Sequence, residues 1–270
     1  MPELPEVETS RRGIEPHLAG RRIARITVRQ PQLRWPVPVA ALQQLQGETL
    51  GPVERRAKYL KLHYAGGYIL VHLGMSGSLR VIAAAEPWKT HDHIELQLDN
   101  GKALRYHDPR RFGCWLLQAA GGEHPLLDGL GPEPLQADFD GDYLYRLSRG
   151  KKQAVKSWIM DNHVVVGVGN IYAAESLFLA GIHPKRAAGR ISLARYRQLA
   201  DAIRQVLAAA ITQGGTTLRD FTNSDGAPGY FQQTLNVYGR SGQPCRHCQT
   251  PVQAIKLGQR STFYCSQCQK

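Results

Sequence analysis

Four of the five cysteines in this 270-residue chain lie in its last segment, residues 245–270. They form two Cys-x2-Cys pairs, Cys245 with Cys248 and Cys265 with Cys268. This spacing lets two tight turns present four thiolates tetrahedrally to one zinc ion. Because the protein fills all four ligand positions, the metal is predicted to be structural and to hold together a module too small to fold alone. The fifth cysteine, Cys114, lies in an apolar stretch and is predicted to be a buried, inert thiol.

The chain is strongly basic, with 34 Lys and Arg against 22 Asp and Glu and a net charge of +12. Residues 226–270 contain no acidic side chain, so the zinc ribbon is a basic module. Its basic residues are Arg240, Arg246, Lys256, Arg260 and Lys270. Such a charge favours a polyanionic partner such as nucleic acid, although excess charge can also serve solubility alone.

Composition and hydropathy predict a folded protein with two domains. Hydrophobic residues make up 42% of the chain, enough to build cores, and the length suits two domains of ~100 to 200 residues. The first residues contain three glutamates and no apolar run, and nowhere do ~18 apolar residues follow one another. We therefore expect neither a signal peptide nor a transmembrane helix, and a cytosolic location.

Residues 22–117 show the two-residue alternation of half-buried strands. Leu60 and Leu62, for example, flank Lys61. Turn signals such as Asp-Asn-Gly at 99–101 separate the strands at short intervals. This pattern predicts an antiparallel sandwich or barrel rather than a parallel sheet.

Helical periodicity begins after the Gly/Pro-rich stretch 129–134. Apolar residues recur at helical spacing over 193–211, behind Ser192 as a possible N-cap. Earlier helices are predicted at about 153–161 and 171–180, with a glycine turn between them.

The predicted fold class is α+β. Residues 1–132 form an antiparallel β-sandwich led by a short helix that starts near Pro5, residues 133–239 form a helical domain, and residues 240–270 form the zinc ribbon. Within the helical domain, residues 214–239 have little periodicity and are predicted to be a long loop, a kind of segment that is usually functional or disordered.

The N-terminus itself carries reactive chemistry. Pro2 follows Met1, and a small second residue permits removal of the initiator Met, which leaves a prolyl secondary amine. An α-amino group has a pKa near ~8, about two units below lysine, so more of it is nucleophilic at neutral pH. A secondary amine condenses with an aldehyde to a cationic iminium, which is a strong electron sink. Glu3 and Glu6 supply nearby carboxylates, although the alternative is a frayed terminus with a helix-capping acid.

Turns between the predicted strands gather cationic and aromatic side chains. In Asp-Pro-Arg-Arg-Phe at 108–112, a proline turn would push an aromatic ring and guanidinium groups outward together, which suits invasion of a base stack. Purely structural roles are also possible for the residues of these turns. Lys58 can be a solvated strand residue, Met75 can fill the core, and His91 with His93 can form an exposed pair.

A glycine turn, Val-Gly-Val-Gly-Asn at 166–170, lies between two predicted helices. Its glycines would let backbone N–H groups of the next helix approach a phosphate closely. Gly-x-Gly alone is a weak motif, and a nucleotide-binding loop is excluded because no strand precedes it and no Gly-Lys-Ser/Thr follows.

Taken together, these motifs resemble the bacterial formamidopyrimidine-DNA glycosylase family. The resemblance covers the whole chain in family order. It rests on Met-Pro-Glu-Leu-Pro-Glu-Val-Glu-Thr, Arg-Arg-Ala-Lys58-Tyr, His-Leu-Gly-Met75-Ser-Gly, Asp-Pro-Arg-Arg-Phe-Gly, Gly-Val-Gly-Asn170-Ile-Tyr and the four-cysteine ribbon. It implies a helix-two-turn-helix in the helical domain and a bifunctional enzyme of base-excision repair. Such an enzyme removes oxidised purines, chiefly 8-oxoguanine and formamidopyrimidines, from damaged double-stranded DNA and then cleaves the strand, and we expect it to be a monomer.

The resemblance also implies catalytic roles, residue by residue. Pro2 resembles the nucleophile that attacks the sugar C1′ and forms the Schiff base, and Glu3 resembles the acid that protonates the ribose oxygen. Lys58 resembles the proton donor associated with the damaged base and β-elimination. Arg260 matches the donor for δ-elimination, and Glu6 resembles a second acid of the pocket. Because these donors belong to different domains, we expect the active site between them.

A second set of residues resembles DNA contacts. Met75, Arg110 and Phe112 resemble the triad that fills the gap left by the everted nucleotide. Loop 214–239 corresponds to the segment that closes over the flipped base, and its Arg219 lies where family members vary. Backbone contacts are implied for His91, Arg110, Lys151, Lys156 and Asn170.

Two other functions fit parts of the pattern. The related endonuclease VIII type shares the Pro-Glu start and prefers oxidised pyrimidines, but the Pro-Glu-Leu-Pro-Glu-Val opening, the Asp-Pro-Arg-Arg-Phe turn and the long loop favour the purine enzyme. A non-catalytic zinc-ribbon protein that recognises bent or damaged duplex gives no reason for the Pro2-Glu3 terminus.

Overall fold

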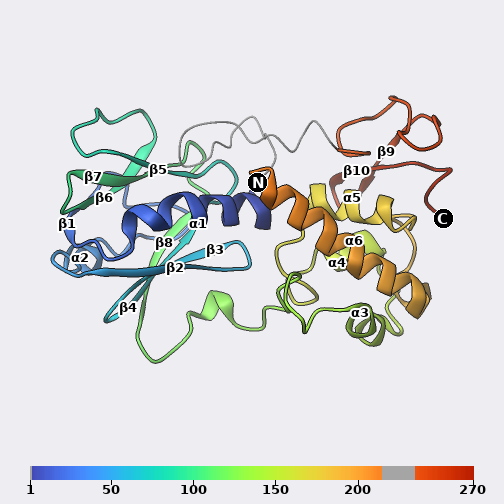
Figure 1. Cartoon of the computed structure of the whole chain (residues 1–270), viewed down its shortest axis with the longest axis horizontal. Helices are drawn as coiled ribbons and strands as arrows, with labels where there is room; N and C mark the ends of the chain where they lie inside the picture. Colours follow the sequence, from blue (N-terminus) through green and yellow to red (C-terminus); the bar gives the residue numbers. More distant parts are fainter. Residues whose placement is uncertain (1, 215–234) are drawn as a thin grey trace. The chain divides into compact units, whose positions relative to one another are not determined.

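A computed structural model describes residues 2–214 and 235–270 (Figure 1). The chain divides into two compact units at Asp128/Gly129. Among the described residues, 2–128 and 213–214 belong to the first unit, and 129–212 with 235–270 belong to the second. The predicted α+β class is confirmed, with strands in the first unit and mainly helices in the second.

Two antiparallel sheets make up most of the first unit. The first has the order β1-β6-β7-β5 and the second β2-β3-β4-β8. The strands of the first sheet are β1 (Ile23–Val28), β6 (Asp92–Leu98), β7 (Lys102–His107) and β5 (Ser78–Ala83). Those of the second are β2 (Leu50–Arg56), β3 (Tyr59–Tyr64), β4 (Gly67–His72) and β8 (Cys114–Ala119). The strands predicted from the alternation therefore form a sandwich, because each sheet has one apolar face to bury.

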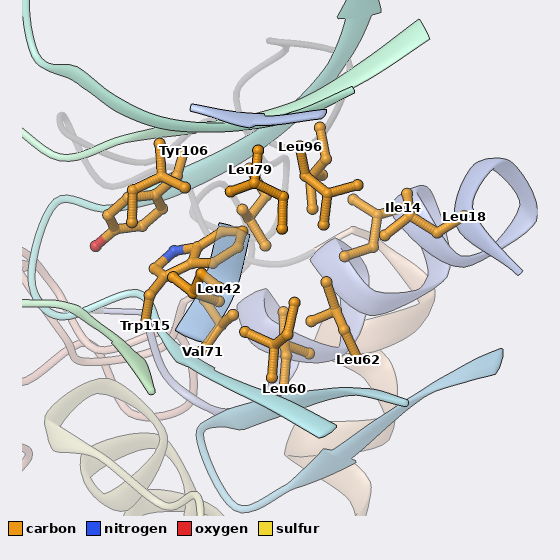
Figure 2. Close-up of a cluster of buried hydrophobic side chains, with 14 of the residues drawn as sticks. Ile14, Leu18, Leu42, Leu60, Leu62, Val71, Leu79, Leu96, Tyr106 and Trp115 are labelled. Atoms are coloured by element: carbon orange, nitrogen blue, oxygen red, sulfur yellow. The ribbon is translucent and has the colours of Figure 1, made fainter. Parts of the chain in front are cut away.

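The core of the first unit lies between these sheets. Figure 2 shows Leu60 and Val71 of one sheet facing Leu79 and Leu96 of the other, with Trp115 filling the space beside them. All five side chains are buried. The short helix α2 (Val39–Gln43) adds Leu42 to the same cluster.

Helix α1 (Leu4–Leu18) precedes the sheets and is longer than the short helix predicted. Its start agrees with the position of Pro5. It continues past Pro16 to its end because Ile14 and Leu18, four residues apart on one face, are buried in the sandwich core (Figure 2). The local sequence signals thus mark where α1 begins, while packing against the sheets determines how far it continues.

Among its described residues the second unit holds four helices, of which the last three were predicted. They are α3 (Gly141–Ser148), α4 (Val155–Ile159), α5 (Asn170–Leu179) and α6 (Leu193–Thr212), with two 3₁₀ turns, η1 (Pro125–Leu127) before the unit and η2 (Ala188–Arg190) within it. Ser192 caps α6 as predicted, since its hydroxyl accepts the Arg195 backbone N–H at 3.4 Å. Helix α3 was not predicted, although Asp140 caps it through the Tyr143 N–H at 2.7 Å.

The antiparallel hairpin of β9 (Gln253–Leu257) and β10 (Arg260–Tyr264) lies in the ribbon. Preceding it, residues 235–238 form the end of the predicted loop, and they are held by buried Glu175 of α5. Both carboxylate oxygens of Glu175 accept backbone N–H groups, from Asn236 at 2.8 Å and from Val237 and Tyr238 at 2.9 Å. The part of loop 214–239 that precedes residue 235, Arg219 included, lies outside the described residues apart from Gly214.

None of the helices in the described ranges has the length and apolar character needed to cross a lipid bilayer.

Candidate functional site

The N-terminus is buried and tied to the first turn of α1. Pro2 is buried, Glu3 is 3% exposed and Glu6 is 0% exposed. The Glu3 backbone N–H donates to Glu6 Oε2 at 2.8 Å, while the Glu3 carboxylate accepts the backbone N–H of Glu6. This reciprocal capping box holds two carboxylates within one helical turn of the Pro2 nitrogen. The acid of the alternative interpretation does cap the helix, since Glu3 is the N-cap of α1, but the terminus is folded from Pro2 onward rather than frayed.

An ionic network joins the next turn of α1 to the turn that carries Lys58. Glu8 receives hydrogen bonds from Arg11, Arg12 and, at 3.2 Å, Arg55 of β2. Burial alone would raise the pKa of Glu8, but the hydrogen bonds from Arg11 and Arg12 and the charge of Arg55 outweigh it and lower that pKa. Arg55 also donates to the Ala57 carbonyl at 3.0 Å, so the strand turn is anchored to the helix.

Lys58 follows Ala57, whose φ of 55° is in the left-handed region. Its side chain is only 7% exposed, so the solvated strand lysine considered above is wrong. The turn that carries Lys58 joins β2 to β3 and is anchored to α1 by the Arg55–Glu8 ion pair.

Two adjacent turns carry the predicted gap-filling residues. Met75 lies between β4 and β5 and is 37% exposed, so it is not a core filler. Phe112 lies between β7 and β8 and is 44% exposed. The Arg110 guanidinium lies 4.9 Å from the centre of the Phe112 ring. A flexible thioether, an aromatic ring and a cation therefore project from one end of the sandwich.

A cavity of about 660 Å³ lies beside these turns. It is lined by residues 32–34, His72 and both turns. The His72 Nδ1 accepts the Gly74 N–H at 2.9 Å, and its ring packs against Tyr59 at 4.8 Å. Burial, reinforced by the charges of Lys58 and Arg34, lowers the pKa of His72 to about 4. The imidazole is thus neutral at pH 7, with its proton on Nε2.

His72 predicts a pH dependence of stability. Its folded pKa of about 4 lies below the ordinary 6.5, so the unfolded chain takes up the proton first as the pH falls. The contribution of neutral His72 to the free energy of unfolding is complete above the ordinary pKa, and it is lost as the pH falls toward about 4. We expect a loss of at most ~1.4 kcal/mol per pH unit in that window.

His72→Asn is expected to make this loss shallower, because its amide oxygen still accepts the Gly74 N–H but does not titrate. The measurement is the urea unfolding free energy at about pH 7 and about pH 5. His91→Asn is the matched control, since His91 is exposed and asparagine tolerates its φ of 70°. Equal slopes for His72→Asn and wild type would contradict the prediction.

His91 and His93 are not the exposed pair considered above. His91 is exposed, but His93 is 8% exposed and its Nε2 lies 2.8 Å from the Asp108 carbonyl oxygen. Burial lowers the pKa of His93, against the effect of that carbonyl. A polar cavity of about 380 Å³ beside them is lined by Arg29 and Trp88 among others, so His91 opens onto a cationic surface.

In the second unit, Lys156 and Asn170 form one hydrogen-bonded cluster with the ribbon. The Lys156 ammonium donates to Asn170 Oδ1 at 2.5 Å and to Thr262 Oγ1 at 2.7 Å. The Asn170 amide donates to the Ser261 carbonyl at 3.0 Å. Lys156 is 1% exposed, in contrast to the direct DNA contact expected from the sequence. The buried ammonium instead positions Asn170, the first residue of α5, against β10.

Arg260 begins β10 and is exposed, and its guanidinium lies 3.9 Å from the Met160 sulfur. The preceding Gln259 has a φ of 62°, as a tight hairpin turn requires. Lys151 is exposed in the segment between α3 and α4. The structure assigns Lys58 to the first unit and Arg260 to the second.

Four cysteines form the metal site of the ribbon. The sulfur atoms of Cys245, Cys248, Cys265 and Cys268 all lie within 4.8 Å of one another. Four thiolates at such separations suit the tetrahedral sites that hold zinc through sulfur at ~2.3 Å. Cys245 and Cys265 are 0% exposed and pack on Phe178 and Val237, so the site also joins the ribbon to α5. The arrangement fits one structural zinc ion.

Cys248→Ser is expected to remove the zinc and unfold the ribbon, because a hydroxyl is a poor zinc ligand and the module buries few apolar side chains. Bound zinc measured by atomic absorption should fall from one per chain to near zero, and amides of β9 and β10 should lose protection from hydrogen exchange. The matched control is Cys114→Ser. Cys114 is 0% exposed and far from the cluster in sequence, and burial raises its pKa to about 12. A full zinc content in Cys248→Ser would refute this assignment.

Several residues of these sites escaped the sequence reasoning. Asp108 is 0% exposed and its carboxylate accepts three hydrogen bonds, although its only local signal was the proline turn. Thr262 and Glu175 are buried partners of distant segments. No local pattern marks them, since each acts on a residue more than fifty positions away.

Comparisons with known proteins agree with the three parts of the chain. Residues 1–115 match the family model of the formamidopyrimidine-DNA glycosylase N-terminal domain, and residues 130–222 match its H2TH domain. Residues 242–270 match a zinc finger found in FPG and IleRS.

Full-length relatives give the same result. The chain is 63% identical to a formamidopyrimidine-DNA glycosylase of Marinobacter nauticus and 60% identical to one of Alcanivorax borkumensis, with 100% of each chain covered. A solved structure of a Lactococcus lactis FPG variant with DNA containing Fapy-dG is similar at 33% identity, with a TM-score of 0.93 and 100% of both chains covered. A structure of MutM with DNA containing carbocyclic 8-oxo-G is similar at 34% identity, with a TM-score of 0.92 and the same coverage. This chain therefore belongs to the formamidopyrimidine-DNA glycosylase family.

Proposed function

We propose that this protein is a base-excision repair enzyme that removes oxidised purines, 8-oxoguanine and formamidopyrimidines, from double-stranded DNA and then cleaves the strand as a lyase. It acts as a monomer with one structural zinc ion. The observation that carries the proposal is the buried terminus, in which Glu3 and Glu6 are joined by a capping box next to Pro2. A capping box by itself serves only the helix, but a DNA-binding protein without catalysis gains nothing from burying both carboxylates beside the Pro2 nitrogen.

The chemistry follows from these groups. The Pro2 nitrogen forms a bond to the sugar C1′ and releases its proton, the bond from C1′ to the base breaks, and the base leaves with the electron pair and takes up a proton. Glu3 protonates the ribose ring oxygen, so the ring opens as the nitrogen lone pair forms the iminium. The secondary amine suits this step because its iminium must be cationic. Glu6 fits the role of a second acid, since its carboxylate fixes the Glu3 backbone.

Strand cleavage uses the iminium as an electron sink. Loss of the 2′ proton expels the 3′ phosphate, loss of the 4′ proton then expels the 5′ phosphate, and water hydrolyses the iminium to regenerate Pro2. Lys58 fits the donor for the base and β-elimination, since it is buried and lies in a turn anchored to α1. Arg260, exposed at the start of β10, fits the donor for δ-elimination.

Access to C1′ requires the damaged nucleotide to leave the helix. Met75, Arg110 and Phe112 are exposed on neighbouring turns and suit filling the gap that remains. Unstacking costs a few kcal/mol, and phosphate contacts of a chain with net charge +12 offset it.

For the phosphate contacts we propose His91, Lys151 and Asn170, with Arg110 in both roles. Lys156 supports Asn170 from beneath instead of contacting DNA, because its ammonium is buried between Asn170 and Thr262. Loss of the ribbon in Cys248→Ser should also weaken duplex binding, since β10 carries Arg260 and the partners of Lys156. Arg219 remains a proposed member of the lesion loop.

We also propose three domains. They are the catalytic sandwich in 1–132, the helical domain in 133–239 and the ribbon in 240–270. The unit boundary at Asp128/Gly129 and the family models ending at 115 and starting at 130 support the first limit. The zinc-finger model starting at 242 supports the second. We place the enzyme in the bacterial cytosol, at the nucleoid, where its substrate is.

One experiment tests the function against both alternatives. The protein is mixed with sodium borohydride and a duplex carrying 8-oxoguanine or an oxidised pyrimidine, and the linked peptide is weighed by mass spectrometry. We expect an adduct at Pro2 with preference for 8-oxoguanine, in agreement with the names of the relatives. Preference for the pyrimidine would favour the endonuclease VIII type, and no adduct on either duplex would leave the non-catalytic DNA-binding protein.

A further inference from the structure

Two turns of the sandwich are joined by a buried hydrogen bond between side chains. Ser76 follows Met75 in the β4-β5 turn, and Asp108 precedes Arg110 in the β7-β8 turn. The Ser76 hydroxyl donates to Asp108 Oδ1 at 2.7 Å and accepts the Arg110 backbone N–H at 3.2 Å. Ser76 is 3% exposed and Asp108 is 0% exposed, so water does not compete for this bond.

The second carboxylate oxygen of Asp108 holds the far end of its own turn. Asp108 Oδ2 accepts the Tyr106 hydroxyl and the Gly113 backbone N–H, both at 2.9 Å. Tyr106 keeps its proton, because burial, followed by the charge of Asp108, raises its pKa well above the ordinary value. The Asp108 carboxylate therefore connects three places. They are Tyr106 at the end of β7, Gly113 at the end of the β7-β8 turn, and Ser76 in the β4-β5 turn.

The two turns also touch through their backbones. Gly74 has a φ of 65°, and a Cβ added there would lie 2.4 Å from the Gly113 nitrogen and from the Phe112 carbonyl carbon. The glycine thus permits an approach that any side chain would prevent. The backbones of the two turns that carry Met75 and Phe112 are consequently in direct contact. Each of these two side chains is exposed, although its turn is anchored in the core.

We propose that Ser76 and Asp108 are positioning residues that lock the two turns into one rigid wedge, so that Met75, Arg110 and Phe112 enter the DNA stack together. This inference rests on the proposed function, in which those three side chains fill the gap. It concerns residues that contact neither the base nor the sugar. Without the lock, each side chain would have to be ordered separately when the nucleotide leaves the helix.

The test is a double-mutant cycle of Ser76→Ala with Met75→Ala in the full chain. The first readout is single-turnover excision of 8-oxoguanine opposite cytosine in a duplex. The second is the fluorescence of a 2-aminopurine beside the lesion, which rises when the stack opens. Because Ser76→Ala leaves a buried carboxylate oxygen and the Arg110 N–H without their partner, we expect excision and stack opening to slow roughly tenfold.

A positioning role makes the two changes non-additive. Once Met75→Ala has removed the leading side chain of the wedge, adding Ser76→Ala should slow both steps less than about twofold. Ser78→Ala is the matched control, because Ser78 is also buried, at 4% exposed, but lies outside this hydrogen-bond network. It should leave both rates unchanged.

The proposal is overturned if Ser76→Ala slows excision by the same factor with and without Met75, or if Ser78→Ala is equally slow. If Ser76→Ala does not fold, Asp108→Asn takes its place, since it keeps the shape and one acceptor oxygen, and the same non-additivity is expected. Failure of the proposed function is distinct, because the wild-type protein would then excise nothing.

Discussion

Protein that retains Met1 is expected to form no borohydride-trapped adduct with an 8-oxoguanine duplex. In that form the Pro2 nitrogen belongs to a peptide bond, and its lone pair is delocalised into the carbonyl. It can neither attack C1′ nor form an iminium. We expect the yield of adduct to fall at least about 100-fold, measured by gel shift and by the mass of the linked peptide.

Matched proteins for this comparison come from one gene. Cells in which methionine aminopeptidase is inhibited supply the chain with Met1, and treatment of that same preparation with the purified aminopeptidase exposes Pro2. Trapping should appear after the treatment. An undiminished adduct in the form that retains Met1 would exclude Pro2 as the nucleophile and would direct attention to a lysine, with Lys58 the first candidate.

Glu3→Gln is expected to slow excision of 8-oxoguanine by about 10² to 10⁴, the usual contribution of a general acid. The amide has nearly the shape of the carboxylate and still accepts the Glu6 backbone N–H, so the capping box and α1 should persist. Its amide N–H groups are far too weakly acidic to protonate the ribose oxygen. The measurement is single-turnover excision, with duplex affinity determined in parallel and expected to remain unchanged.

A second substrate isolates the acid step. On a duplex with a preformed abasic site the sugar is already an aldehyde for part of the time, so Glu3→Gln should still be trapped. Glu15→Gln is the control, because Glu15 lies on the same helix and bonds to Arg11 away from Pro2. Normal excision by Glu3→Gln would disprove the acid role.

Much of the fold was predictable because its signals are local. Alternating apolar residues such as Leu60 and Leu62 gave strands in the right places, and Ser192 marked the start of α6. The limits of α1 were not predictable, since its continuation to Leu18 depends on burial against sheets formed later in the chain. Helix α3 was missed because it is only eight residues long, so its apolar pattern repeats too few times to stand out, and Asp140 is the single turn signal before it.

The candidate site divides in the same way. Pro2, Glu3 and the four cysteines are recognisable because their chemistry needs neighbours in sequence, either an amine beside a carboxylate or two thiols with two residues between them. Lys156 was assigned to the DNA backbone through the family resemblance, and the structure buries it against Thr262, more than one hundred residues away.

The amino-acid sequence by itself therefore determined the class of chemistry, the family, and the order of a strand-rich part followed by a helical part. These properties depend on residue type, spacing and periodicity. Tertiary structure alone decided which polar groups are buried and which residues they hold. Asp108 and Ser76 are 32 positions apart, and only the pairing of β5 with β7 brings them to 2.7 Å. Hydrogen bonds act over about 3 Å whatever the separation in sequence, so such partners are visible only once the chain has folded.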